Sequence, residues 1–323
     1  MSRKETRTCR ESSAVRITVV LAVRAPPGRL LAVRPPPGRL LASRAQAGAA
    51  AAVMAVKPGA EPFRHSGGPV GVLLCHGFTG SPQSLRPWAE FLAGAGLSVS
   101  LPRLPGHGTT WQEMNRTRWG DWYAEVDRAF QELRTDAEEI FVAGLSMGAC
   151  LALRLAEQRG SAVRGLVLVN PSVTADTKLF LLAPVLKLVV SSLKAVGDDI
   201  KKPGVTEGAY DRTPTKAAAS LPGLWKATQA QLGQVSAPVL VFKSTEDHIV
   251  GPASIEMLRR SLPAGQLTVR DCPDSFHVAT LDNDAEAIFT GSLDFIHEHS
   301  AIGKQGGSGE RDAGWRSGDG QRT

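Results

Sequence analysis

The residue of this sequence whose surroundings best suit chemistry is a serine set between two glycines. The run Gly144-Leu145-Ser146-Met147-Gly148 follows an apolar stretch typical of a strand, and a helical pattern begins directly after it. Small neighbours let a sharp strand-to-helix turn lift the serine hydroxyl above a sheet, while the first N–H groups of the helix point at the same place. The short pattern alone arises by chance, so its position between strand and helix carries the prediction. We expect Ser146 to be a nucleophile; the alternative is a structural or phosphate-binding glycine turn.

A serine hydroxyl needs a general base, and the chain offers seven histidines. His277 lies in the loop after the last predicted strand, where the base belongs in folds whose chain order is serine, acid, histidine. His65 lies outside the predicted sheet, and His297 and His299 end the last predicted helix, where histidines more often cap carbonyl groups. The remaining three are His76, His107 and His248, which follow earlier strands. We predict His277 as the base, against a structural loop histidine.

The acid that orients this base is expected at the end of the preceding predicted strand. The segment after residue 243 supplies two candidates, Glu246 and Asp247. Asp247 is the prediction, because the loop needs a few residues to carry its carboxylate across to the imidazole, and Glu246 remains the alternative. Asp271 and Asp274 are nearer to the histidine in sequence, but acids within such a loop are more often turn residues.

Acyl transfer also needs N–H donors aimed at the oxygen on which negative charge develops. One donor is expected from Met147, directly after the nucleophile. The second is expected from Phe78, in the glycine-flanked loop after the first predicted strand. Gly77 and Gly80 would let this backbone turn close to a substrate. The sequence therefore predicts an oxyanion hole formed by Phe78 and Met147.

The elements that must position these residues alternate between strand and helix. Strands are expected at 69–75, 97–101, 140–143, 163–169, 238–243 and 267–270. Helices are expected at 81–94, 119–135, 147–158, 254–262 and 285–297. This alternation predicts an α/β fold with a doubly wound, mostly parallel sheet. An insertion from about 171 to 235 interrupts it, so residues 54–300 are expected to form one α/β domain with an inserted helical cap.

The two ends of the chain differ in composition from this domain. Residues 1–53 carry a ten-residue, proline- and arginine-rich repeat that fits neither helix nor central strand, and we expect a disordered basic extension lying upstream of a folded protein that opens at Met54. An arginine-rich tether or targeting arm is the alternative. Residues 301–323 are rich in glycine and serine and are expected to be a disordered tail.

Charge and cysteine usage exclude some classes of partner. The net charge of +6 comes from residues 1–53, which hold ten basic and two acidic residues, whereas residues 54–300 hold 23 basic and 26 acidic ones. A mildly acidic domain lacks the field that neutralises phosphates, so no nucleic-acid partner is expected. Four cysteines without a C-x-x-C pair predict a reducing, cytoplasmic location. Oligomeric state is left open.

Several blocks of sequence together resemble the α/β-hydrolase carboxylesterases, and most closely the bacterial monoacylglycerol lipases. The resemblance runs from about residue 59 to 299 through GAEPF (59–63), GPVGVLLCHGFTG (68–80), LPRLPGHGT (101–109), IFVAGLSMG (140–148), TEDHIV (245–250) and SFHVATLD (275–282). It implies a serine ester hydrolase without metal or cofactor, acting on single-chain acyl esters such as monoacylglycerol. Its implied site residues agree with those reached above. A short- or medium-chain carboxylesterase, or an acyltransferase or perhydrolase on the same residues, is the alternative.

The insertion then corresponds to the cap of these lipases. The resemblance implies that Glu207, in the block 198–214, helps to hold the glycerol head group, against a solvated cap acid. Residues 179–196 are apolar but interrupted by Pro184, Lys187, Ser191 and Lys194, which favours an amphipathic lid over a membrane-spanning helix. Such a lid predicts transient contact with a lipid surface.

Overall fold

The computed structural model describes residues 55–175, 190–195 and 197–302. The predicted extension, most of the predicted tail and most of the apolar stretch 179–196 lie outside these residues. Within the described ranges, no helix is both long and apolar enough to cross a bilayer.

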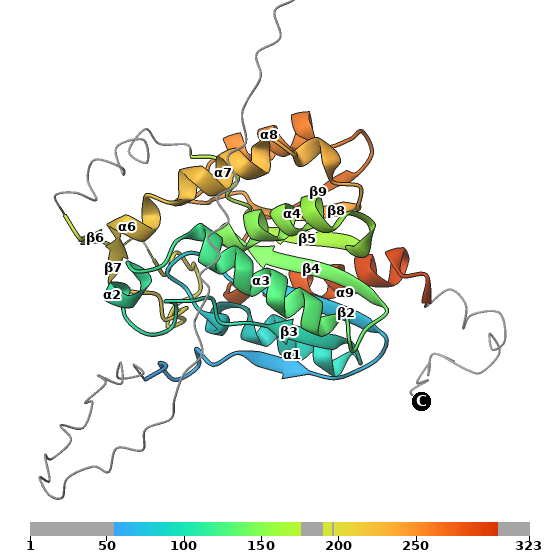
Figure 1. The fold of residues 1–323 in the computed structure, drawn as a ribbon, viewed down its shortest axis with the longest axis horizontal. Coiled ribbons are helices and arrows are strands. Elements are labelled where there is room, and N and C mark those ends of the chain that lie inside the picture. The colour runs from blue at the N-terminus through green and yellow to red at the C-terminus, as the bar shows by residue number, and fades with distance from the viewer. Residues whose placement is uncertain (1–54, 176–189, 196, 303–323) are drawn as a thin grey trace, which may run out of the picture. The chain divides into compact units, whose positions relative to one another are not determined.

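A seven-stranded sheet forms the centre of the fold (Figure 1). Its order is β1 (Phe63–His65), β3 (Ser98–Leu101), β2 (Val70–Cys75), β4 (Glu139–Leu145), β5 (Gly165–Val169), β8 (Val239–Ser244) and β9 (Leu267–Cys272). Neighbouring strands run parallel except β1, which is antiparallel to β3. The predicted mostly parallel α/β architecture is confirmed.

The central strands are apolar runs buried on both faces, as parallel sheets covered by helices require. Every residue of β5 is buried, and so is every residue of β2 and β4 after the first. The register pairs Cys75 with Gly144 and Leu145 with Val169. Because parallel strands end together, the loops that follow β2, β4 and β5 emerge side by side at one edge.

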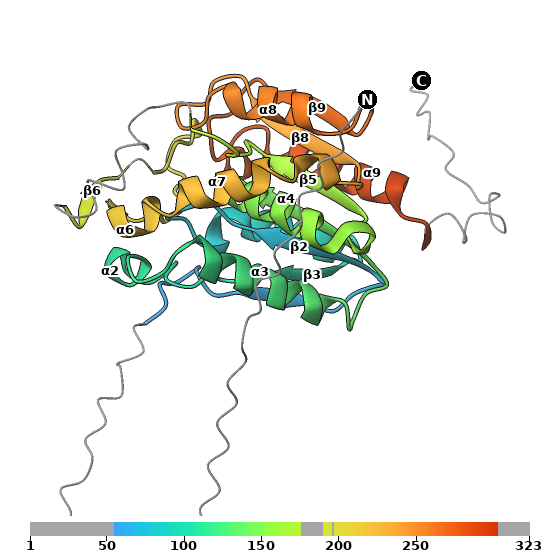
Figure 2. The same cartoon turned by 45° about the horizontal axis from the view of Figure 1, so that its top comes forward.

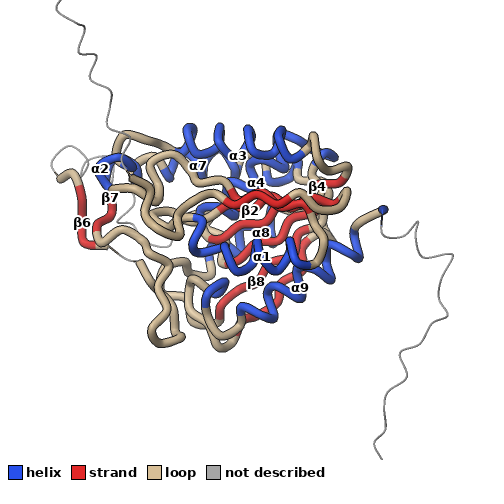
Figure 3. The backbone as a smooth tube through the Cα atoms, turned by 90° about the horizontal axis from the view of Figure 1, so that it is seen from below, coloured by secondary structure: helices blue, strands red, loops and turns tan. Residues whose placement is uncertain are grey.

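Helices cover both faces of the sheet (Figure 3). One face packs against α1 (Arg86–Gly94) and α9 (Ala285–His299), whose apolar residues form one core with the sheet. The other packs against α3 (Trp119–Leu133), α4 (Met147–Arg159) and α8 (Ala253–Ser261). Short 3₁₀ turns complete the layers at η1 (Pro82–Leu85), η2 (Gly160–Ala162), η3 (Leu232–Gln234) and η4 (Ala279–Leu281).

The described part of the insertion lies at the end of the domain toward which β4 points (Figures 1 and 2). It contains a two-stranded antiparallel sheet and two helices, β6 (Ser192–Lys194), β7 (Arg212–Pro214), α6 (Thr215–Ala218) and α7 (Leu221–Gln229). Helix α7 packs on α4, and the short α2 (Trp111–Met114) contacts β7. The cap is therefore fixed to the edge where the central strands end.

Two details differ from the sequence prediction. His65 belongs to the sheet after all, because β1 pairs with β3 and brings His65 opposite Val99. The helix expected at 81–94 is split: Ser81 caps η1, and α1 starts only at Arg86. Proline at 87 has no N–H to donate, so the helical hydrogen bonds cannot run on unbroken from the first turn.

Candidate active site

Ser146 lies in a strained turn between β4 and α4. Its φ is 57° and its ψ is −118°, in the region that favours glycine. A Cβ on Gly148 would come to 1.9 Å from the carbonyl oxygen of Cys75, and one on Gly144 to 2.6 Å from the N atom of Ala149. Both flanking glycines are therefore required, because they let α4 start directly against the end of β2.

Asp247 and His277 meet beside this turn. Nδ1 of His277 lies 2.9 Å and 3.1 Å from the two carboxylate oxygens of Asp247. The same carboxylate accepts 2.8 Å hydrogen bonds from the N–H groups of Ile249 and Val250. Burial raises the pKa of Asp247, but the hydrogen bond and charge of His277 and these two N–H groups outweigh it, so the net pKa is lowered. Asp247 is thus held as an anion facing the imidazole.

The other candidates for acid and base have other surroundings. Glu246 is 57% exposed in its side chain and approaches Nε2 of His248 at 3.5 Å instead of His277. His76 is fully buried, its Nε2 accepts a hydrogen bond from the N–H of Leu104, and burial lowers its pKa to about 4. Burial also holds the pKa of His107 well below its usual range. Buried neutral histidines of this kind fit loop packing.

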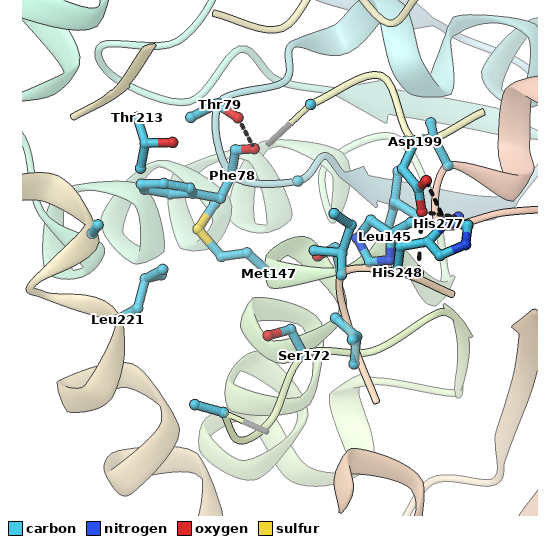
Figure 4. A pocket seen from close by; sticks show the side chains of 18 of the residues that line it. Phe78, Thr79, Leu145, Met147, Ser172, Asp199, Thr213, Leu221, His248 and His277 are labelled. Atoms are coloured by element: carbon cyan, nitrogen blue, oxygen red, sulfur yellow. Dashed lines mark hydrogen bonds and ion pairs between the residues drawn. The ribbon is translucent and has the colours of Figure 1, made fainter. Parts of the chain in front are cut away.

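A cavity of about 390 Å³ joins most of the predicted site residues. Five of them line it, namely Phe78, Ser146, Met147, Glu207 and His277. The sixth, Asp247, lies behind the imidazole of His277. Figure 4 shows Phe78, Met147 and Leu221 toward one side of this cavity and Asp199, His248 and His277 toward the other. The cavity thus has an apolar side and a polar side.

The loop after β2 is shaped by its own strained residue. Thr79 has a φ of 63°, and its hydroxyl donates a 2.6 Å hydrogen bond to the carbonyl of Phe78 (Figure 4). The Phe78 ring packs edge-on against Trp122, 5.8 Å away between centroids. Phe78 and Met147, the first residue of α4, both line the cavity.

Glu207 is a buried carboxyl group on the wall of the cavity. Glu207 is 7% exposed, and a Cβ on Gly80 would come to 2.9 Å from its Oε2. Burial raises its pKa to about 7, although the charge of His277 and the N–H of Asp198 act in the opposite direction. Near neutral pH this group can therefore exist in both protonation states.

Two further residues at the site were not identified from the sequence. Asp199 of the cap accepts hydrogen bonds from the main-chain N–H of His277 at 3.1 Å and from Nδ1 of His248 at 2.8 Å. Asn170, directly after β5, donates to the carbonyl of His277 at 2.8 Å. Asn-Pro at a strand end is a turn signal that could have drawn attention to Asn170. The sequence carries no comparable signal for Asp199.

Comparison with known proteins identifies the family of this chain. The family Hydrolase_4, described as serine aminopeptidase S33, matches residues 70–284. Over 252 residues the chain is 41% identical to the thermostable monoacylglycerol lipase of Bacillus sp. (strain H-257). The match covers 76% of this chain and 97% of that protein. This chain belongs to the α/β-hydrolase family. It is a carboxylic ester hydrolase.

Solved structures agree with this α/β-hydrolase assignment. A metagenome-derived lipolytic enzyme, from a study of LipS and LipT, superposes with a TM-score of 0.74 at 38% identity, over 76% of this chain and 100% of that one. The monoacylglycerol lipase of Paleococcus ferrophilus shares the fold with a TM-score of 0.62 at 22% identity, over 74% and 100% of the two chains. A carboxylesterase of Bacillus subtilis is 23% identical in sequence over 74% of this α/β-hydrolase and 96% of that protein.

Proposed function

We propose that this α/β-hydrolase cleaves monoacylglycerols through Ser146, His277 and Asp247 and an acyl-enzyme intermediate. The observation that carries the proposal is the 2.9 Å contact between Asp247 and Nδ1 of His277, with His277 and Ser146 lining one cavity. A carboxylate at Nδ1 fixes the tautomer that leaves Nε2 free to accept a proton.

In the first half-reaction, Oγ of Ser146 attacks the ester carbonyl and Nε2 of His277 takes the hydroxyl proton. The carbonyl π bond opens, and the N–H groups of Phe78 and Met147 stabilise the resulting oxyanion. His277 then gives the proton to the departing alcohol as the C–O bond breaks. Asp247 remains ionised throughout and stabilises the imidazolium form.

In the second half-reaction, water attacks the acyl-enzyme with His277 again as base. The proton of this water passes through the imidazole to Oγ of Ser146 as the acyl–oxygen bond breaks. A free carboxylic acid leaves, and the enzyme returns to its starting state. Replacement of water by another alcohol or by peroxide would give the acyltransferase or perhydrolase alternative.

The two sides of the cavity suit the two parts of a monoacylglycerol. The apolar side at Phe78, Met147 and Leu221 suits an acyl chain, and Glu207 supplies a polar group for glycerol hydroxyls. The 41% identical relative, named a monoacylglycerol lipase, supports this substrate class. A cap over the site favours one chain over a branched triacylglycerol.

Exposed apolar residues near the cavity support contact with a lipid surface. Leu193 of the cap and Ile249 both line the cavity, and they are 38% and 37% exposed. Val190, the first residue of the described segment 190–195, is also 37% exposed. We propose that this rim meets the lipid surface from which substrate enters.

The test is a hydrolysis panel of monoacylglycerols against methyl esters of the same acyl chains, run beside a serine-directed fluorophosphonate probe. We expect probe labelling that is lost in Ser146→Ala, a fall of about 10⁴-fold or more in kcat for His277→Ala, and faster cleavage of the glycerol esters. Wild-type labelling no stronger than that of Ser146→Ala would refute the nucleophile. Equal rates on both ester series would instead support a general carboxylesterase.

A further inference from the structure

Asn170 is a buried polar residue behind the cavity, at the carboxyl end of β5. It is 2% exposed and has a φ of 44°, which asparagine tolerates better than most residues. It is absent from the lining of the cavity, so it does not face a substrate. Any effect of Asn170 on the reaction must therefore pass through the residues that it contacts.

The amide of Asn170 ties together two loops. Its Nδ2 donates to Oγ of Ser244 at 2.9 Å and to the carbonyl of His277 at 2.8 Å, so both amide protons are used. Its Oδ1 accepts the N–H of Ser244 at 2.8 Å. Oγ of Ser244 in turn donates to the carbonyl of Phe276 at 2.7 Å. Asn170 and Ser244 thus hold two successive carbonyl groups of the loop that carries the base.

We propose that Asn170 is a positioning residue for His277, acting with Ser244 to fix the main chain from which the imidazole projects toward the cavity. The proposal rests on the proposed role of His277 as the base. From the cap side, the carboxylate of Asp199 holds the N–H of His277 at 3.1 Å. The peptide groups on both sides of the base are therefore anchored, the carbonyls by the sheet and the N–H by the cap.

This anchoring matters because Asp247 contacts the imidazole only through Nδ1. That contact leaves the ring free to follow any shift of its own main chain. A displacement of about 1 Å at a reacting group can cost about a hundredfold in rate. Loss of the Asn170 amide should consequently slow proton transfer and leave substrate binding unchanged.

Asn170→Asp is the sharpest probe, since the substitution keeps the shape of asparagine and the acceptor for the N–H of Ser244. An ionised carboxylate cannot donate to the His277 carbonyl and would repel it. A protonated carboxyl has one O–H, so it can restore one of the two donations, and burial favours that form. Relative to the wild type at the same pH, Asn170→Asp should therefore be impaired at pH 8 and less impaired at pH 6, whereas Asn170→Ala should be impaired at both.

The experiment measures the single-turnover acylation rate and KM of the full chain with a p-nitrophenyl ester. A first-order acylation rate reports only folded molecules, so partial unfolding of a variant does not obscure it. We expect Asn170→Ala to lower this rate by about tenfold to about a hundredfold with KM unchanged. Ser244→Ala should lower it as well, and the double variant should lose less than the product of the two effects, because both residues hold the same loop.

Asn283→Asp is the matched control. In the wild type, Nδ2 of Asn283 also donates to a main-chain carbonyl, that of Asp274 at 3.0 Å, in the exposed part of the same loop. We expect its acylation rate to equal that of the wild type. Wild-type rates in both Asn170 variants would overturn the positioning role, and so would a loss confined to KM.

His277→Ala distinguishes a failure of the proposed function from a failure of the role proposed for Asn170. If this variant keeps wild-type activity, the proposed function fails and the base lies elsewhere. If it is inactive while the Asn170 variants acylate at the wild-type rate, the proposed function stands and only the role of Asn170 is overturned.

Discussion

Backbone strain in this α/β-hydrolase is concentrated at single residues around the active site. Among the residues that the structure describes, four that are not glycine have a positive φ: Thr79, Ser146, Asn170 and Asp198. They lie in the loop after β2, at the proposed nucleophile, behind the proposed base and in the cap. Each such conformation costs about 1–3 kcal/mol and persists only where its surroundings enforce it. The fold therefore concentrates strain where geometry matters for chemistry.

Glu207 gives a prediction about stability and pH. Its pKa is about 7 in the folded protein because of burial, against an ordinary value of 4.5. The folded state thus binds a proton that the unfolded state has released, so stability falls as pH rises from about 4.5 through about 7. We expect Glu207→Gln to be more stable than the wild type at pH 8, by about 1 to 3 kcal/mol, and equal to it near pH 4.5.

Urea unfolding at a series of pH values measures this difference. Glu246→Gln is a suitable control, because Glu246 is 57% exposed in its side chain. A stability difference between Glu207→Gln and wild type that does not change with pH would contradict the raised pKa.

At the scale of elements, the position of the proposed nucleophile, Ser146, depends on how closely α4 approaches β2. A Cβ on Gly148 would be 1.9 Å from a carbonyl oxygen of β2. Backbone cannot rotate away as a flexible side chain does, so the first turn of α4 would have to move. The position of Ser146 is thus determined by packing between a helix and a strand.

Gly148→Ala is therefore expected to destabilise the protein by about 1 to 3 kcal/mol and to reduce esterase activity. The matched control is Gly120→Ala in α3, where an added Cβ meets nothing within 4 Å. Removing a helical glycine should stabilise by about 0.5–1 kcal/mol. Urea unfolding midpoints measure both, and a Gly148→Ala protein as stable as wild type would contradict the packing argument.

The cap is joined to the loops of acid and base by another element-scale contact, between Asp199 and His248. Asp199 raises the pKa of His248, and Glu246 adds to this effect. The folded state therefore holds the imidazolium proton more tightly than the unfolded state. The stabilisation is complete below about pH 6.5 and is lost as pH rises through the raised folded value.

We expect the thermal midpoint of His248→Gln to lie below that of the wild type at pH 6 and to converge with it at pH 9. Hydrogen exchange of the segment 198–202 should show the same pattern, with faster exchange in the variant at pH 6 only. Identical exchange at pH 6 in the two proteins would mean that this ion pair does not hold the cap.

At the scale of the whole molecule, charge and catalysis belong to different parts of the chain. Residues 54–300 carry more acidic than basic residues, and the basic excess lies in residues 1–53. At the carboxyl end of the described domain, Ser300 and Ala301 hydrogen-bond to the carboxylate of Glu139 at 2.6 Å and 3.0 Å.

A chain from Met54 to Ile302 is expected to keep the esterase activity and thermal midpoint of the full chain, since the site and both cores lie within it. It should bind a cation-exchange resin less tightly at pH 7, because it lacks ten basic residues of the extension. Calorimetry and kcat/KM on one ester measure the first two. A loss of folding or activity would show that the extension or the tail takes part in the domain.

Local patterns were sufficient to predict most elements. Short apolar runs bounded by turn residues predicted the buried strands β2, β4, β5 and β8. In β3 and β9, which were also predicted, apolar residues stand at alternate positions. The edge strand β1 was not predicted, since its three residues, Phe63–His65, are exposed or half-buried and do not form an apolar run. The strands β6 and β7 are equally short and escaped for the same reason.

For the candidate site, the sequence by itself determined the residue types and the edge of the sheet where they gather, because chain order and strand ends are local properties. Only the tertiary structure decided which partners meet. It turned Asp247 rather than Glu246 toward His277, buried Glu207 against the loop at Gly80, and brought Asn170 and Asp199 to the two peptide groups that flank the side chain of His277. Such contacts join residues from 30 to 127 positions apart, and they depend on distances that no local pattern encodes.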